Sequence, residues 1–343
     1  MTNLNMKNPQ LIKSILLILT LISFISCGRQ ERVKIGFLFP NMATDRFKKE
    51  KVYFTQKLEE LGGEAMVLSA EYDDKVQISQ AKELIDKGAK VLVVNCLNLN
   101  TAAAIIRDAH DNNDVKVIAY DRLIRNCDLD YYLTFDNEKV GKLMADYITK
   151  IKPEGNYIIL GGDKGDQNAV WVKKGQLDAL ATLVNAKKIN IVYNNFVEDW
   201  SGENAQNEIR KYLDLSRNIP DVVLSSYDGM STGVIDLFKE YKIAPGRVLV
   251  TGQDAELAAC RNIVEGYQTM TIYKSVKTLA YKAAEIAMKI SRHEKIQEAT
   301  RRISNGQKDV PTILLEPVTV DINNLKTTVI ADGFHTESEI YGK

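Results

Sequence analysis

The chain has 343 residues, of which 45% are hydrophobic and 26% are charged, an ordinary globular composition. At about 100–200 residues per domain, this length predicts two domains, each large enough to bury its own core. The 45 Lys and Arg residues balance 45 Asp and Glu residues, so the formal net charge is zero. This balance excludes non-specific electrostatic binding of nucleic acid by the chain as a whole.

Residues 1–26 have the features of a secretory signal peptide. Lys7 and Lys13 both precede an apolar run over 15–25. This run is well short of the roughly 20 residues needed for a membrane span. The run leads into a small residue followed by Cys27, which resembles a bacterial lipobox. We therefore expect an exported protein, lipid-anchored through Cys27, in the periplasm or on the cell surface. A plain cleaved signal is the alternative, because an aromatic first residue is unusual in a lipobox.

Removal of this leader changes the charge and the cysteine count. The two lysines leave with it, so the mature chain has two more acidic than basic residues. Cys96, Cys127 and Cys260 remain, and an odd number cannot pair completely within one chain. Cys96 lies in an apolar run and is expected to be a small buried hydrophobe. No CxxC pair or Cys/His cluster occurs, so we expect no metal site and no cofactor.

Short apolar, β-branched runs predict strands, and most of them are separated by stretches with helical spacing. The strands are expected at 33–39, 65–68, 90–94, 115–120, 131–135, 157–160, 189–193, 221–225, 247–251, 269–273, 312–315 and 327–330. The helices include 46–61, 75–87, 101–112, 138–152, 169–184, 203–215 and 231–241. This alternation predicts an α/β fold with largely parallel sheets. The strands are too many for one doubly wound sheet of this length, so we expect two, with a first crossing near 135–138.

Polar and aromatic residues follow many of the predicted strands, where ligands collect in open parallel sheets. Asp and Asn accept hydrogen bonds from hydroxyls, Arg, Lys and Asn donate to them, and aromatic faces pack on the C–H patches of a sugar ring. A single Asp at a strand end is more often a helix cap, but the recurrence favours a site. The residues are Arg46, Phe47, Asp121, Arg122, Asp166, Asn168, Asp199, Trp200, Tyr227, Asp228, Gln253, Asp254 and Lys274.

Five segments carry a resemblance to a known family. They are A-Y-D-R (119–122), F-D-N-E-K-V-G (135–141), G-Q-D-A (252–255), Q-T-M-T-I-Y-K (268–274) and A-D-G-F-H (331–335). They resemble the ribose/galactose-type (type I) periplasmic sugar-binding proteins of bacteria, in particular those for D-xylose. The resemblance runs from about residue 33 to the C-terminus, and its motifs are long and in the right order.

The resemblance implies two doubly wound parallel-sheet lobes that are joined by a three-segment hinge and close on a monosaccharide without enzymatic activity. The first lobe would comprise 33–136 plus about 274–308, and the second 137–273 plus about 309–343. Delivery of the sugar to an ABC importer permease is the implied output. Signalling to a sensor kinase or chemoreceptor would use the same closure, and the sequence does not separate the two.

The resemblance also assigns sugar contacts residue by residue. The first lobe would supply Arg46, Phe47, Asp121 and Arg122, the second lobe Asp166, Asn168, Trp200, Tyr227 and Asp254, and Lys274 would complete the set. Phe47 and Trp200 would sandwich the ring. Phe47 stands where the family has Trp, and Tyr227 where it usually has Asn. The expected ligand is therefore D-xylose or a related aldopentose, with the particular sugar left open.

One unrelated motif offers a remote alternative. Residues 229–233 fit G-x-S-x-G, and Ser231, Asp254 and His335 follow the chain order of a serine hydrolase triad. Five-residue patterns with two free positions arise often by chance, so this hypothesis is the weaker one.

Overall fold

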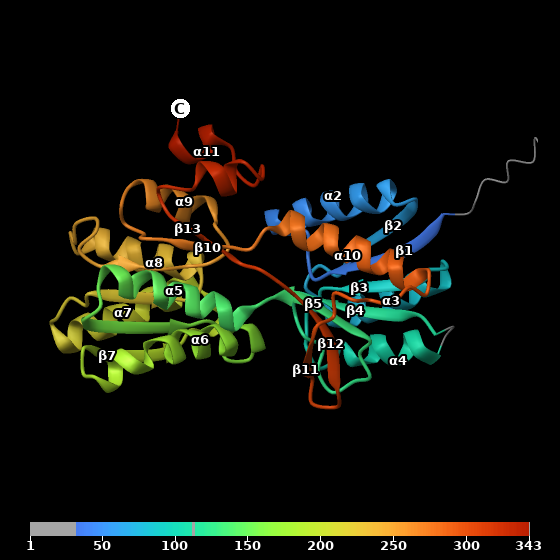
Figure 1. The fold of residues 1–343 in the computed structure, drawn as a ribbon, viewed down its shortest axis with the longest axis horizontal. Coiled ribbons are helices and arrows are strands. Elements are labelled where there is room, and N and C mark those ends of the chain that lie inside the picture. Colours follow the sequence, from blue (N-terminus) through green and yellow to red (C-terminus); the bar gives the residue numbers. More distant parts are fainter. Residues whose placement is uncertain (1–31, 112–113, 343) are drawn as a thin grey trace, which may run out of the picture.

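The computed structural model describes residues 32–111 and 114–342, which form two α/β lobes side by side (Figure 1). The expected signal peptide and Cys27 lie outside these residues. Across the two described ranges, no helix combines the length and apolar character needed to cross a membrane.

The first lobe is built on a seven-stranded sheet with the order β11-β12-β5-β4-β3-β1-β2. Its strands are parallel except for the antiparallel pair β11 and β12. The strands are β1 (Val33–Phe39), β2 (Gly63–Ser69), β3 (Val91–Val94), β4 (Lys116–Tyr120), β5 (Tyr131–Phe135), β11 (Arg301–Ser304) and β12 (Asp309–Leu315). One face packs against α3 (Asp74–Asp86) and α4 (Ala103–Asp111), and the other against α2 (Asp45–Glu60) and α10 (Val276–Ser291).

The second lobe has a parallel four-stranded sheet with the order β7-β6-β8-β9, which a bridge between Gln253 and Ile272 extends to the antiparallel pair β10 and β13. The strands are β6 (Gly155–Gly161), β7 (Ile189–Phe196), β8 (Val222–Ser225), β9 (Leu249–Val250), β10 (Thr271–Tyr273) and β13 (Val318–Val320). The helices are α5 (Asn137–Ile151), α6 (Gln167–Asn185), η1 (Glu198–Trp200), α7 (Gly202–Ser216), α8 (Asp228–Glu240), α9 (Leu257–Val264), η2 (Lys326–Ile330) and α11 (Glu337–Tyr341).

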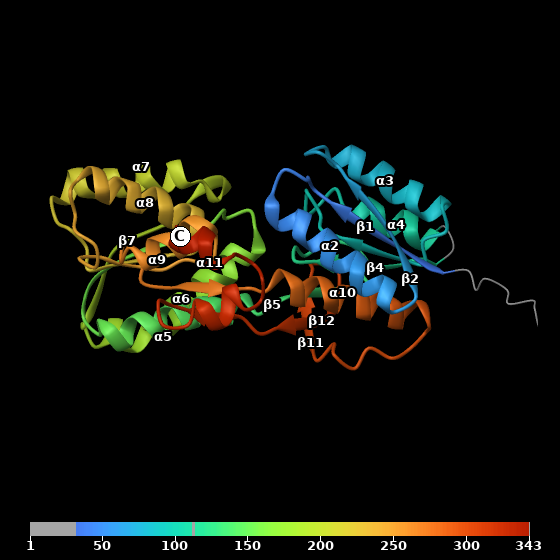
Figure 2. The same cartoon turned by 90° about the horizontal axis from the view of Figure 1, so that it is seen from above.

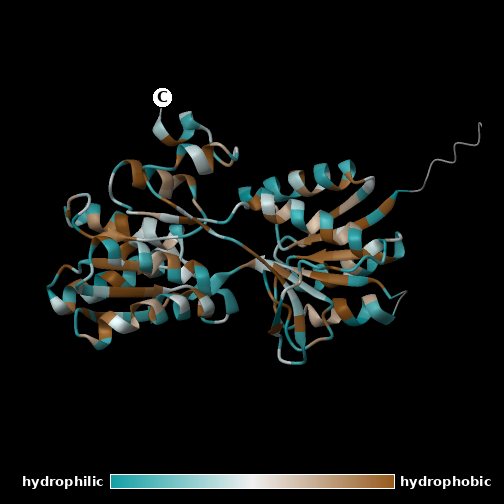
Figure 3. Cartoon of the chain, in the orientation of Figure 1, coloured by the Kyte–Doolittle hydropathy of each residue, from teal (hydrophilic) through white to brown (hydrophobic). Residues whose placement is uncertain are grey.

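Both sheets are covered on two sides, as the view from above shows (Figure 2). The strands are mostly hydrophobic along their length, whereas the helices are amphipathic, with hydrophobic and hydrophilic residues on different faces (Figure 3). This is the pattern of a parallel sheet buried between helices. The prediction of two largely parallel α/β sheets is confirmed.

The chain passes between the lobes at three points, after β5, after β10 and after β12 (Figure 1). Two of these segments lie side by side, because the N–H of Asp136 donates to the carbonyl of Leu315 at 3.1 Å. The expected division placed everything from about 309 in the second lobe, and this boundary is too early. β12 pairs in parallel with β5, so the third crossing follows Leu315. An apolar β-branched run predicts a strand but does not identify the sheet that receives it.

The strand expected at 327–330 is wrong, because this segment is the helical turn η2. The N–H of Ile330 donates to the carbonyl of Leu325 at 3.2 Å, and Val329 is fully buried with Leu325 in a cluster under α9 and α11. Burial in that cluster overrides the β preference of the Thr-Thr-Val-Ile run, which is a weak, context-dependent preference.

The close packing of α5 on α6 generates a stability prediction. A Cβ on Gly141 would lie 1.9 Å from the carbonyl oxygen of Val172, which is backbone and cannot rotate away. Gly141→Ala should therefore lower the free energy of unfolding by about 1–3 kcal/mol, measured by urea unfolding. The control is Gly165→Ala, whose Cβ would meet only the side-chain Oδ1 of Asp163, at 2.9 Å. Equal stability of the two variants would contradict this packing.

Candidate functional site

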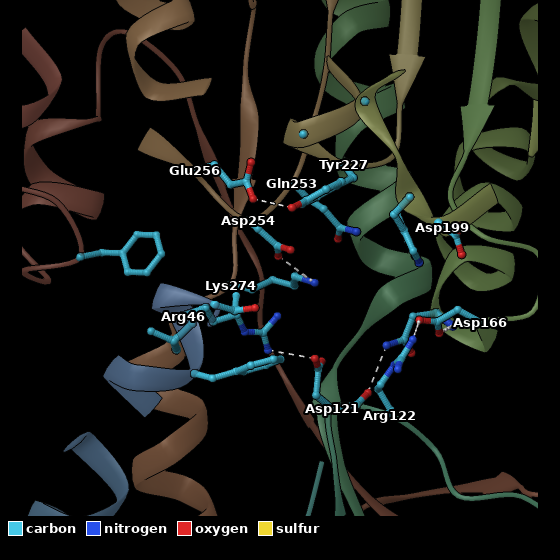
Figure 4. A pocket seen from close by; sticks show the side chains of 18 residues that line it. Arg46, Asp121, Arg122, Asp166, Asp199, Tyr227, Gln253, Asp254, Glu256 and Lys274 are labelled. Atoms are coloured by element: carbon cyan, nitrogen blue, oxygen red, sulfur yellow. Dashed lines mark hydrogen bonds and ion pairs between the residues drawn. The ribbon is translucent and has the colours of Figure 1, made fainter. Parts of the chain in front are cut away.

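A cavity of about 550 Å³ lies between the lobes, at the carboxyl ends of their strands. All ten predicted contact residues line it, namely Arg46, Phe47, Asp121, Arg122, Asp166, Asn168, Trp200, Tyr227, Asp254 and Lys274. Charged side chains from both lobes point toward the same hollow (Figure 4). The structure thus brings the predicted set together.

The first-lobe part of the cavity centres on Arg46 in the first turn of α2. Its Nη2 donates to Oδ2 of Asp121 at 2.9 Å, and its Nε donates to Oε1 of Glu50 one turn along the helix at 2.7 Å. Burial raises the pKa of Asp121, but the charges of Arg46, Lys274 and Arg122 outweigh burial, so this pKa lies below its ordinary value. Asp121 therefore lines the cavity as a carboxylate.

A second ion pair crosses from one lobe to the other. Nη2 of Arg122, just after β4, donates to Oδ2 of Asp166 before α6 at 3.1 Å. Nη1 of Arg122 also donates to the carbonyl of Leu97 at 3.3 Å, which fixes the guanidinium on its own lobe. The amide Nδ2 of Asn168 donates to the carbonyl of Asp121 at 3.1 Å. These contacts join the lobes directly at one wall of the cavity.

A third ion pair joins Lys274 to Asp254 at 2.9 Å, and both side chains face the cavity (Figure 4). Asp254 has φ +92°, and Asp121 and Trp200 also have positive φ, at +65° and +54°. Such backbone is costly for a residue with a Cβ and is retained where the surrounding structure over-determines it, which happens most often at functional sites. Three of the residues that line this cavity thus hold a backbone conformation that is costly outside glycine.

An aromatic wall is held rigidly in the second lobe. The ring of Trp200 lies against Gly162, where a Cβ would come within 2.2 Å of it. The Tyr227 ring meets Trp200 edge to face, with centroids 6.0 Å apart and planes at 85°. The Tyr227 hydroxyl donates to the carboxylate of Glu256. Burial, followed by the charge of Glu256, raises the pKa of Tyr227, so the phenol stays protonated.

The cavity also has lining residues that were not among the predicted contacts, including Thr44, Asp199, Gln253, Glu256, Val276 and Phe334. Asp199 and Gln253 are among the strand-end candidates of the sequence but not among the contacts that the resemblance assigns, and Phe334 lies in the A-D-G-F-H motif. Glu256 had no such signal. Its inward position follows from Asp228, whose Oδ2 accepts the backbone N–H of Glu256 at 3.0 Å.

Each cation of this site is compensated by a carboxylate, whereas Asp199 and Glu256 line the cavity without an ion-pair partner among the described residues. Each of the three cations that line it, Arg46, Arg122 and Lys274, has a carboxylate partner within 3.1 Å. An anionic ligand would have to displace one member of a pair and leave the other uncompensated, which is costly in a partly buried site. An uncharged ligand with several hydroxyls can donate to the carboxylates and accept from the cations while every pair stays together.

The serine hydrolase hypothesis is not supported by this geometry. Ser231 is fully buried, and its hydroxyl lies 2.6 Å from the carbonyl of Thr251 and 2.9 Å from that of Tyr227. Nε2 of His335 lies 2.9 Å from the carbonyl of Ala255, and Asp254 pairs with Lys274. The three residues of the expected triad thus have other partners.

The cysteines are structural in the described part of the chain. Cys96, Cys127 and Cys260 are free and buried, as expected for Cys96. Burial raises the pKa of the Cys96 thiol to about 12, which keeps it protonated and unreactive. Among residues 32–111 and 114–342, no group of three or more His, Cys, Asp or Glu side chains is arranged to hold a metal ion.

Comparison with known proteins agrees with the fold and the cavity. The periplasmic binding protein domain matches residues 35–295. The chain is 42% identical to the D-xylose-binding periplasmic protein of Haemophilus influenzae, over 96% of this chain and 99% of that protein. It is 38% identical to the D-xylose-binding periplasmic protein of Escherichia coli over the same shares.

A solved structure is similar as well. An ABC transporter solute-binding protein from Clostridium phytofermentans with bound β-D-glucose superposes with a TM-score of 0.79 at 30% identity, over 90% of this chain and 99% of that one. Two α/β lobes around a polar cleft are typical of a solute-binding protein. This chain belongs to the periplasmic binding protein family, in its type I sugar-binding group.

Glu50 generates a pH prediction. It is fully buried beneath Arg46, and burial raises its pKa from 4.5 to about 7 despite the nearby guanidinium. Between these pH values the folded state binds more protons than the unfolded state, so this group lowers the free energy of unfolding as the pH rises. The stability of Glu50→Gln relative to the parent chain should therefore increase by a few kcal/mol as the pH rises from about 4.5 to 7.5.

Urea unfolding across this pH range measures the difference. Glu59→Gln, an exposed change on the same helix, is the control and should follow the parent chain. If Glu50→Gln also followed the parent chain at every pH, Glu50 would not titrate as its burial requires.

Proposed function

We propose that this protein captures an uncharged pentose, D-xylose or a closely related aldopentose, between its two lobes and presents it to an ABC importer. The observation that carries the proposal is the set of three mutually paired cations and carboxylates that face one cavity from both lobes. Such a set recognises hydroxyls through charge-assisted hydrogen bonds without requiring a charge on the ligand. Near-full-length identity to two D-xylose-binding proteins supports the same ligand class.

The aromatic residues complete the proposed recognition. Trp200 from the second lobe and Phe47 from the first both line the cavity, and a pyranose ring between them would cover its C–H faces. A sugar held by both lobes binds the closed arrangement better than the open one. Binding therefore shifts the equilibrium toward closure, and the closed shape is what a permease would recognise.

Tyr227 is proposed to tune which sugar is preferred. Its hydroxyl is engaged by Glu256, so the ring presents bulk and an apolar edge to the cavity where an amide would present a donor and an acceptor. A site that must pair its polar groups rejects ligands that leave them unpaired. Replacing Tyr227 is thus expected to change the order of preference among pentoses.

Export and anchoring form the remaining part of the proposal. We infer that residues 1–26 direct export and that Cys27 carries the lipid that holds the protein at a membrane, close to its permease. Both features lie outside the described residues and rest on the sequence motif. No contact in residues 32–111 or 114–342 favours a sensor as the receiver, so uptake is the output proposed here.

The ligand assignment is tested by calorimetry on the chain without residues 1–27. A panel of D-xylose, D-ribose, L-arabinose, D-glucose and D-galactose should give one saturable site, tightest for D-xylose or another pentose. Tyr227→Asn, measured on the same panel, should alter the order of the pentoses. The absence of heat and of any thermal shift with every sugar would refute the proposal.

The contacts are tested by two substitutions in the cavity. Asp121→Ala removes an acceptor and leaves Arg46 short of a partner, and Trp200→Ala removes the ring platform. Each should weaken binding of the preferred sugar roughly 10- to 100-fold, about 1.4–2.8 kcal/mol. Asp178→Ala and Tyr241→Ala, both exposed, are matched controls that should bind normally. Normal affinity in both cavity variants would show that the contacts are misassigned.

A further inference from the structure

The segment 331–335, which carries the A-D-G-F-H motif, joins the two lobes beside the proposed sugar site. We call this segment the clasp. It directly follows η2 of the second lobe, and Gly333 in its middle has φ +74°. Phe334 is only 8% exposed and lines the cavity, so the clasp reaches the site itself. The ten assigned sugar contacts include no residue of this motif and therefore do not account for it.

The clasp is fixed to the second lobe on one side. Nε2 of His335 donates to the carbonyl of Ala255 at 2.9 Å, and Ala255 directly follows Asp254, which faces the cavity. The ring of Phe334 lies 5.5 Å from that of Tyr273 on β10, and both rings belong to one buried cluster. The clasp is thus expected to move with the second lobe.

The other side of the clasp contacts the first lobe through α2. Nζ of Lys49 donates to the carbonyl of Phe334 and lies 4.5 Å from the centre of its ring, where the face of an aromatic ring attracts a cation. Tyr53, one turn further along α2, packs against the first-lobe core and also against the cluster that contains Phe334. Because α2 also carries Arg46, the clasp ties a cavity-lining helix of the first lobe to the second lobe.

The clasp also holds the second crossing of the chain between the lobes. Oδ2 of Asp332 accepts from the hydroxyls of Tyr273 and Ser275, each at 2.6 Å. Ser275 in turn caps α10, because its Oγ accepts the N–H of Thr278 at 3.1 Å. Nζ of Lys277, in the first turn of α10, lies 3.8 Å from Oδ1 of Asp332. One carboxylate thus fixes the direction in which α10 leaves the second lobe.

We propose that the clasp holds the lobes in the arrangement that brings the sugar contacts together, and that Lys49 and Asp332 are positioning residues for sugar binding. Neither residue is among those that line the cavity, so both act through the placement of the lobes. The apparent affinity for a ligand held by both lobes scales with the fraction of chains already in the competent arrangement. The effect on affinity rests on the proposed function, whereas the effect on the placement of the lobes does not.

The placement of the lobes is measured without sugar, by the distance between nitroxide labels at Lys82→Cys on α3 and Leu215→Cys on α7. Both positions are exposed and lie on the side away from the crossings (Figure 2), while the cysteines of the described chain are buried. Lys49→Met keeps most of the hydrocarbon stem and removes the donor and its charge. It should raise the ratio of long to short label distances at least about twofold. Lys51→Met, an exposed change on the same helix, should match the parent chain.

A second variant addresses the crossing. Asp332→Asn keeps the shape of the side chain and removes the charge that the two hydroxyls share, so it should lengthen the label distances in the same direction. In calorimetry with D-xylose, Lys49→Met and Asp332→Asn should each raise the Kd about fivefold or more. Lys51→Met and Asp236→Asn, both exposed changes, should leave the Kd at the value of the parent chain.

Label distances of Lys49→Met and Asp332→Asn that match those of their controls would overturn the proposal, whether or not a sugar binds. Weaker sugar binding with unchanged distances would overturn it too, because the two residues would then act on the site by another route. If the parent chain binds no sugar at all, the proposed function fails, and the distances of the sugar-free chain still decide the role of the clasp.

Discussion

The structure depends on one electrostatic constraint, which is that each cation facing the partly buried cavity has a carboxylate partner. Arg46, Arg122 and Lys274 each meet a carboxylate there, and the Arg122–Asp166 pair spans the two lobes. Burying any of these charges alone would cost far more than a hydrogen bond returns. The pairs therefore leave no lining cation free for an anionic ligand, and the Arg122–Asp166 pair forms only when the two lobes lie close together.

The fold supplies this arrangement through a simple geometric rule. The carboxyl ends of the parallel strands in each sheet open toward the other lobe, so residues far apart in the chain meet in one hollow. The backbone at Asp121, Asp254 and Trp200 is held at positive φ there, a conformation that persists where the surrounding structure over-determines it. The two lobes are connected by three short crossings of the chain.

Much of the site could be predicted because its residues follow strands in chain order and carry side chains of matching chemistry. The ten contacts were assigned by the resemblance to the type I sugar-binding proteins, and all of them line the cavity. Glu256 could not be predicted, since its inward position depends on a backbone contact to Asp228 that only the folded loop creates. The same is true of Glu50, whose polar side chain at a helical position gave no sign that it is buried under Arg46.

The sequence was sufficient to predict the alternating strands and helices of two α/β sheets. The predictions were wrong where contacts between distant segments determine the structure. β12 has the composition of a strand in either sheet, and pairing with β5 assigns it to the first. The segment 327–330 is rich in β-branched residues and yet forms a helical turn, because burial of Val329 decides its conformation. Local sequence determines which segments are apolar and how they alternate, but long-range contacts choose their partners.

The central claim is that one uncharged sugar is held by paired charges from both lobes. A crystal structure of the chain with D-xylose tests it most directly. The account predicts a sugar with Asp121 and Arg46 of one lobe and Asp254 or Asn168 of the other within hydrogen-bond distance of its hydroxyls, while the Arg46–Asp121 and Lys274–Asp254 pairs stay intact. A sugar that contacts only one lobe, lies outside the cavity, or binds after these pairs have separated would contradict the account.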